Sequence, residues 1–288
     1  MSDLLDDFLE LHVRAKLKPL TIEGYNRYIV NVIKPAFGHR SVTDICKSDI
    51  LKLHSKNSKQ PCRANHIFAT LSKFFNWCED MGYREAGSNP CSRIKKYKID
   101  GKERYLTENE NIQLNQVLES ALRSGNESVY TIAAIQLLRF TGARKMEILN
   151  LKWEMVDLEN SILNLKDSKT GRKRIHLNTN ARKILENLPR VDRNPFVIVG
   201  KKEGRSLVNI QKPWARIRKK ANCDDVRIHD LRHSFASAAV TNGKSLHVVG
   251  KLLGHKQAAT TYRYAHLADS ALKEANEDIG GFLTNENA

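Results

Sequence analysis

Reactive side chains concentrate in four short segments of the chain, and the first of these is "TGARKMEIL". Gly142 permits a tight turn, after which Arg144 stands at the start of an expected helix. Glu147 lies three residues further along, on the same helix face, where its carboxylate can hold the guanidinium. A guanidinium held in this way is a preorganised ligand for phosphate, although an ordinary surface ion pair has the same spacing.

The second segment, "KDSKTGRKR", is rich in cations. Lys169 lies in an expected turn between two strands, from which a flexible ammonium can reach into a groove. The surrounding cations indicate contacts with phosphates or, equally, a solvated basic hairpin. These cations are Lys166, Arg172, Lys173 and Arg174.

The third segment, "HDLRHSF", pairs a histidine with an arginine. His229 and Arg232 are three residues apart and therefore project from one face of a helix. A proton-transfer group beside a phosphate ligand is what phosphoryl chemistry needs, but so short a motif is weak by itself. His233 points to another side of the helix, where we expect it to form a hydrogen bond in the core.

The fourth segment, "LLGHKQAATTYRYAHL", contains two tyrosines. Gly254 is expected to end a helix, and His255 follows at a position from which its side chain can enter a site. Tyr262 and Tyr264 are expected on the next helix, where residues two apart point about 200° apart. The two tyrosines therefore cannot serve the same site: one can be a nucleophile while the other packs or covers.

The charge of the chain indicates its class of partner. The 288 residues carry a formal net charge of +16, of which residues 1–102 contribute +7 and the remainder +9. A folded chain with this balance favours a polyanion, most often nucleic acid. No apolar run approaches the roughly 20 residues of a membrane span, and the acidic N-terminus does not resemble a signal peptide, so a cytoplasmic protein is expected. The five cysteines form no CxxC pair and are expected to be reduced and mostly buried.

The N-terminal hundred residues predict a module of four helices. Apolar residues recur at helical spacing in "LLDDFLELHV", "TIEGYNRYIVNVI", "SDILKLHSKN" and "ANHIFATLSKFFNWCEDMGY". A stretch containing glycine, proline and many lysines then breaks this pattern. We therefore expect a helical domain over residues 1–92, a basic linker over 93–103 and a second domain over 104–288.

The sequence of the second domain predicts a mixed α+β arrangement. Thr107 and Glu110 form a capping box that should open its first helix. The segments "MVDL", "SILNL" and "RKRIHL" predict a small antiparallel sheet with hairpin turns. Helical patterns lie on both sides of these strands, so the predicted fold class is mainly α, with a small antiparallel sheet in the second domain.

Together and in this order, the four segments resemble the tyrosine recombinase, or phage integrase, family. That family has an arginine in T-G-x-R-x-x-E, a lysine in a β-hairpin, an H-x-x-R, and an L-G-H with a tyrosine nine residues after the histidine. Here "TGARKME", Lys169 in "SKTG", "HDLR" and "LLGH" with Tyr264 fill these positions. The resemblance covers residues 103 to about 267 strongly, and the N-terminal module is similar to the core-binding domain of the family.

The resemblance implies a site-specific recombinase that cleaves and rejoins DNA through a 3′-phosphotyrosyl intermediate, with no metal and no other cofactor. In that reaction two arginines bind the non-bridging oxygens, the hairpin lysine protonates the leaving 5′-oxygen and a histidine assists at the tyrosine hydroxyl. The catalytic set implied is Arg144, Lys169, His229, Arg232, His255 and the nucleophile Tyr264, with Glu147 orienting Arg144.

The resemblance also implies partners. They are double-stranded DNA and further copies of the chain, as a homotetramer on two DNA sites. The tail after the nucleophile, "DSALKEANEDIGGFL", would dock onto a neighbouring subunit, with docking on its own core as the alternative. The cations expected to contact DNA are Lys95, Lys96, Lys98, Arg172, Lys173 and Arg174.

Several functions are compatible with this resemblance. Integration or excision of a phage or other mobile element is the function expected, and resolution of chromosome dimers is the first alternative. A type IB topoisomerase shares the tyrosine chemistry. Its segment that resembles "HDLR", however, usually has a lysine at the position of His229. A non-catalytic DNA-binding protein is the last alternative, and the complete residue set argues against it.

Overall fold

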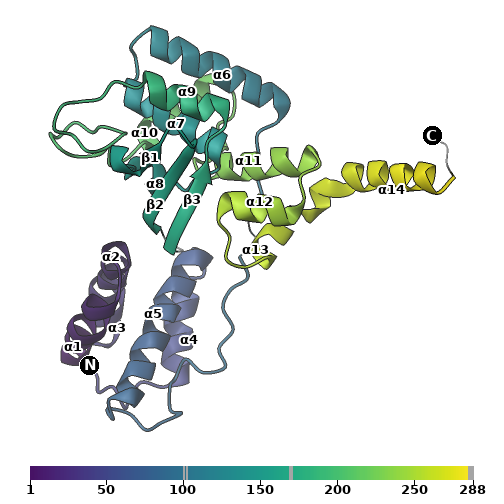
Figure 1. Cartoon of the computed structure of the whole chain (residues 1–288). Coiled ribbons are helices and arrows are strands. Elements are labelled where there is room, and N and C mark those ends of the chain that lie inside the picture. The colour runs from purple at the N-terminus through teal and green to yellow at the C-terminus, as the bar shows by residue number, and fades with distance from the viewer. Residues whose placement is uncertain (100, 102, 169–170, 285–288) are drawn as a thin grey trace. The chain divides into compact units, whose positions relative to one another are not determined.

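The computed structural model describes residues 1–99, 101, 103–168 and 171–284. The chain forms two compact units, Met1–Gly101 and Lys102–Ala288, each with its own hydrophobic core (Figure 1). The described residues are mostly helical, and a three-stranded antiparallel sheet lies in the second unit. The predicted fold class is therefore confirmed.

The first unit consists of helices, as the apolar spacing predicted. Two of the predicted helices contain π-helical turns, and the longest helix carries much of the core on one face. Its Phe74 packs edge-on against Phe8, with ring centroids 5.6 Å apart. The elements are α1 (Ser2–Asp7), η1 (Phe8–Arg14), α2 (Pro19–Tyr28), η2 (Ile29–Ile33), α3 (Lys34–Phe37), α4 (Lys47–Lys56) and α5 (Pro61–Asp80).

The second unit opens with the predicted capping box. The Thr107 hydroxyl accepts a hydrogen bond from the Glu110 backbone N–H at 3.2 Å, and the Glu110 carboxylate accepts one from the Thr107 N–H at 2.8 Å. These bonds start α6 at Glu108. The helices are α6 (Glu108–Arg123), α7 (Val129–Thr141), α8 (Lys145–Leu149), η3 (Trp153–Met155), α9 (Thr179–Asn187), α10 (Gln211–Lys220), α11 (Asp230–Thr241), α12 (Leu246–Leu253), α13 (Ala259–Tyr262), η4 (Ala265–Ala268) and α14 (Asp269–Thr284).

The sheet consists of β1 (Val156–Asp157), β2 (Ile162–Ser168) and β3 (Gly171–His176), in the order β1-β2-β3. Figure 1 shows β2 and β3 as neighbouring long arrows. Leu163 opposes Ile175 across this hairpin, and Leu165 opposes Lys173. Because successive residues of a strand face opposite sides, these positions share the buried face, while Asn164 between the two leucines and Arg174 between Lys173 and Ile175 are exposed.

One helix differs from its predicted length. We expected a single helix carrying both Tyr262 and Tyr264, but α13 ends at Tyr262 and the chain turns into the 3₁₀ segment η4. Tyr264 lies between the two segments, and its backbone N–H bonds to the Thr261 carbonyl at 3.0 Å, the tighter spacing of a 3₁₀ turn. The predicted separation of the tyrosines still holds, because Tyr262 is 68% exposed and Tyr264 only 5%.

Candidate active site

Gly142 forms the turn that places the first candidate arginine. It ends α7 in the left-handed conformation, with φ 60°, and its N–H bonds to the Leu138 carbonyl. A Cβ at this position would lie 2.6 Å from Cδ1 of Phe235 and 2.8 Å from Cδ2 of Leu253. Glycine is therefore required both by the backbone and by the packing, and the turn delivers Arg144 as the N-cap of α8.

We predict that Gly142→Ala lowers the free energy of unfolding by about 2–5 kcal/mol. The left-handed backbone costs an alanine about 1–2 kcal/mol, and overpacking adds about 1–3 kcal/mol. Gly125→Ala is the matched control, because Gly125 has φ 66° but a Cβ added there would meet nothing within 4 Å. Chemical denaturation of both variants should show a clearly larger loss at Gly142. Equal losses would contradict the packing argument.

Glu147 holds two cations at once. Its Oε1 accepts from Nη1 of Arg144 at 2.8 Å, and its Oε2 accepts from the Arg144 backbone N–H at 2.9 Å and from Nζ of Lys173 at 2.9 Å. The Glu147 side chain is 6% exposed. Burial alone would raise the pKa of this carboxyl, but Lys173 and the hydrogen bonds from Arg144 hold the pKa below its ordinary value. The pairing is therefore not a surface ion pair.

Lys173 is not where we expected it. We placed it with Arg172 and Arg174 on a DNA-contacting surface, but it points to the buried face of β3. Burial lowers the pKa of its ammonium to about 8, although Glu147 opposes the shift. Successive side chains of a strand point to opposite faces, so Lys173 must face away from Arg172 and Arg174. The sequence could therefore have revealed this placement.

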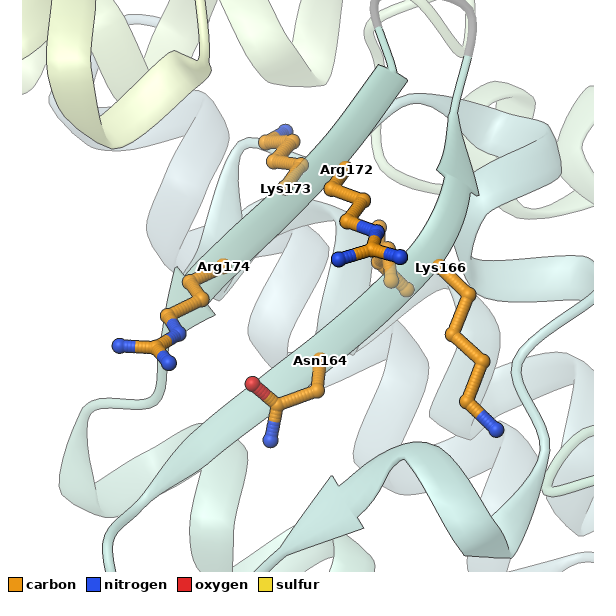
Figure 2. Close-up of a pocket in the computed structure, with 6 residues that line it drawn as sticks. Asn164, Lys166, Arg172, Lys173 and Arg174 are labelled. Atoms are coloured by element: carbon orange, nitrogen blue, oxygen red, sulfur yellow. The ribbon is translucent and has the colours of Figure 1, made fainter.

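The two strands of the hairpin line a basic hollow of about 590 Å³, to which the buried Lys173 contributes as well as the exposed Arg172 and Arg174. Figure 2 shows Arg172 leaving β3 on the opposite side from Lys173, with Asn164 and Lys166 on the adjacent strand. Arg172 and Arg174 are exposed, as a phosphate-contacting surface requires. Lys169, the predicted catalytic lysine, lies outside the described residues.

Arg232 joins the ends of two helices. It projects from α11, and its Nη1 donates to the Gly142 carbonyl at 2.7 Å while Nη2 donates to the Leu253 carbonyl at 2.9 Å. Burial, followed by the nearby charge of Arg144, lowers its pKa to about 10. The bond to the Gly142 carbonyl, two residues before Arg144, places Arg232 close to the start of α8. The Glu147 carboxylate acts in the opposite direction and raises the pKa of Arg232.

Two candidate histidines lie near these cations. His255 follows Gly254, which ends α12 with φ 69°, and its Nδ1 is 2.8 Å from the Thr261 hydroxyl. Burial, then the charges of Arg232 and Arg144, lowers the pKa of His255 to about 4. His229 is exposed at the start of α11, where desolvation and then the charge of Arg232 lower its pKa. Both imidazoles are therefore neutral at pH 7.

Tyr264 has a partner that we did not foresee. Its hydroxyl lies 2.5 Å from Nδ1 of His233. The expected hydrogen bond of His233 is thereby confirmed, but nothing in the spacing of the sequence identified its partner. Burial raises the pKa of Tyr264 and lowers that of His233 to about 4, so a neutral phenol meets a neutral imidazole.

The described residues contain neither a candidate metal site nor a candidate membrane-spanning helix. No set of three or more His, Cys, Asp or Glu there is arranged to hold a metal ion. None of the described helices combines the length and apolar character of a membrane span. Cys78, Cys91 and Cys223 are buried, whereas Cys46 and Cys62 are exposed, and all five are free thiols.

Known proteins resemble this chain over most of its length. Residues 104–271 match the model of the Phage integrase family, and residues 1–57 match that of the Phage integrase N-terminal SAM-like domain. Tyrosine recombinase XerA of Saccharolobus solfataricus is 32% identical over 271 residues, which cover 92% of this chain and 80% of the relative. Tyrosine recombinase XerD of Listeria innocua is 27% identical over 293 residues, covering 95% and 97%. A lambda integrase dimer bound to a COC′ core site has a similar fold, with a TM-score of 0.72 at 19% identity over 90% of this chain and 96% of that one.

Proposed function

The chain belongs to the phage integrase family of tyrosine recombinases, and from this premise we propose that it cleaves and rejoins DNA strands through a covalent bond to Tyr264. The observation that carries the proposal is that Arg232 binds the carbonyls of Gly142 and Leu253. These carbonyls lie two residues before Arg144 and two residues before His255, so the bonds bring the three side chains to one place. Two guanidiniums and a neutral imidazole form a site for a single phosphate. The polyanion that fits a chain of net charge +16 is DNA.

The proposed reaction is a transesterification. The Tyr264 oxygen forms a bond to phosphorus as the bond to the 5′-oxygen breaks, and the phenolic proton leaves with assistance from His229. Arg144 and Arg232 stabilise the charge on the non-bridging oxygens, a contribution worth about 10²–10³-fold for one donor. Lys169 supplies a proton to the departing 5′-oxygen. Since the phosphotyrosyl bond keeps the energy of the broken diester, rejoining needs no cofactor.

The nucleophile must change its hydrogen bond during this reaction. In the structure the Tyr264 hydroxyl is bound to His233 and is largely shielded from solvent. The attack therefore requires exchange of the His233 contact for a contact with phosphate. The exposed Tyr262 is not shielded in this way, and we assign it to packing on or flanking DNA.

The remaining contacts with DNA are proposed for both units. We propose residues 1–92 as the core-binding domain, 93–103 as a linker along the duplex and 104–288 as the catalytic domain. The exposure of the linker lysines and of the two hairpin arginines supports this division. The residues concerned are Lys95, Lys96, Lys98, Arg172 and Arg174.

The biological role we propose is integration or excision of a mobile element in the cytoplasm. Resolution of chromosome dimers is the alternative. Sequencing of the DNA sites recovered from covalent complexes distinguishes them: junctions between unlike replicons support integration, and a single chromosomal site supports resolution.

We propose that the chain acts as a tetramer on two DNA sites, with α14 docking onto a neighbouring subunit. Ile279 and Leu283 support this, since these apolar side chains are 58% and 75% exposed on α14. A chain without residues 270–288 is expected to bind a single site normally but to fail to pair two sites. A gel-shift titration and a two-site synapsis assay measure these properties, and an unchanged synaptic complex would refute the docking proposal.

Covalent trapping tests the function as a whole. A duplex nicked close to the cut site loses a short fragment after cleavage, so the protein stays attached. We expect a complex that survives denaturation, with the nucleotide mapped to the peptide containing Tyr264 by mass spectrometry. Binding of DNA with no covalent product would instead support the non-catalytic alternative.

A further inference from the structure

The Lys173 side chain contacts residues that hold the proposed phosphate ligands in place. These ligands are Arg144 on one side, and Arg232 and His255 on the other. Its ammonium donates to Oε2 of Glu147 at 2.9 Å, and its side chain is only 5% exposed. The same Glu147 carboxylate binds the guanidinium and the backbone N–H of Arg144. The orientation of Arg144 therefore depends on a carboxylate that Lys173 also holds.

The aliphatic part of Lys173 contacts a second element. A Cβ on Gly254 would lie 2.7 Å from Cε and 2.9 Å from Cδ of Lys173, so the lysine chain packs directly against this backbone. Gly254 separates Leu253, whose carbonyl binds Arg232, from His255. Lys173 thus contacts the peptide that positions the other two phosphate ligands.

We propose that Lys173 is a positioning residue of the active site. It fixes Arg144 through Glu147, and it fixes His255 and the Arg232 acceptor through Gly254. This inference rests on the proposed function and adds to it a residue that neither touches DNA nor transfers a proton. Lys173 also lines the basic hollow of the hairpin, but its ammonium is bonded to Glu147 and its side chain is only 5% exposed, unlike those of Arg172 and Arg174.

Lys173→Met tests the proposal, because it removes the ammonium and keeps a long apolar chain. We expect the single-turnover rate of covalent complex formation to fall about 10²-fold at saturating DNA, the effect of misplacing a ligand by about 1 Å. The dissociation constant for DNA should change less than about twofold, since one buried cation makes no phosphate contact. Lys183→Met is the matched control, since Lys183 is exposed on α9 away from the site.

Modified substrates separate positioning from the alternatives. A 5′-bridging phosphorothiolate has a sulfur leaving group that needs no proton, so it should rescue Lys169→Met but not Lys173→Met. A methylphosphonate removes the charge that Arg144 binds, so the defect of Lys173→Met should shrink on it. Rescue of Lys173→Met by the phosphorothiolate would make it a proton donor, and an equal defect on all substrates would make its role purely structural. Either result overturns the proposal.

Glu147→Gln leaves Lys173 in place and weakens its link to Arg144, so by itself it should slow covalent complex formation while the dissociation constant for DNA changes little. Unchanged cleavage in Glu147→Gln would contradict the proposal even if Lys173→Met folds poorly. If both residues act through Arg144, the double variant should be no slower than the slower single variant, because coupled residues are not additive. Fully additive losses would contradict the proposal. Wild-type protein that forms no covalent complex would refute the proposed function instead, so the two failures remain distinct.

Discussion

Replacing Tyr264 with phenylalanine is expected to abolish the covalent protein–DNA complex, with a loss of about 10⁴-fold or more in cleavage rate. Phenylalanine keeps the ring in its buried position but has no oxygen to bond to phosphorus. DNA affinity should persist, because binding depends on cations distributed over the chain. The measurement is single-turnover cleavage of the nicked duplex, with bound protein counted by gel shift.

Tyr262→Phe is the control for this substitution. Tyr262 is 68% exposed and has no place in the proposed phosphate site, so its hydroxyl should be dispensable for cleavage. Tyr264→Phe also removes the hydrogen bond to His233, which costs about 1 kcal/mol. A thermal melt should therefore show a folded protein of slightly reduced stability. A covalent complex that persists in Tyr264→Phe and vanishes in Tyr262→Phe would reverse the assignment.

Residues at short sequence spacing were the predictable part of the site. Helical periodicity placed Arg144 and Glu147 on one face, and the structure shows them bonded at 2.8 Å. The same reasoning placed His233 away from Arg232 and in the core. For Arg232 and His233 one turn of regular helix fixes the relative directions of the side chains. Arg144 is the N-cap of α8, and its contact with Glu147 belongs to a capping box, so local geometry is sufficient there as well.

Contacts over long sequence distances were not predictable from the spacing. His233 and Tyr264 are 31 residues apart, and Arg232 reaches the Gly142 carbonyl 90 residues away. These contacts depend on how α7, α11 and α12 pack, which periodicity does not specify. Even the local geometry of Tyr264 was misjudged, because we assumed a continuous helix where α13 gives way to a 3₁₀ turn.

Arg232→Ala is expected to impair both cleavage and folding. The guanidinium stabilises charge on the phosphate in the proposed reaction, and its loss should slow cleavage about 10²–10³-fold. It also satisfies two backbone carbonyls, at Gly142 and Leu253, that lie at the ends of buried helices. Leaving two buried acceptors without donors should lower the free energy of unfolding by about 2–4 kcal/mol.

Arg232→Lys separates these two effects. Lysine keeps the positive charge but presents a single ammonium, which cannot span two carbonyls as the planar fork of arginine does. We expect Arg232→Lys to regain part of the stability and to remain well below wild type in cleavage, because the ammonium that binds one carbonyl is withdrawn from the phosphate. Urea denaturation and single-turnover cleavage measure the two quantities on the same preparation. Wild-type cleavage in Arg232→Ala would remove this residue from the phosphate site and leave it only the structural role of joining α7 to α12.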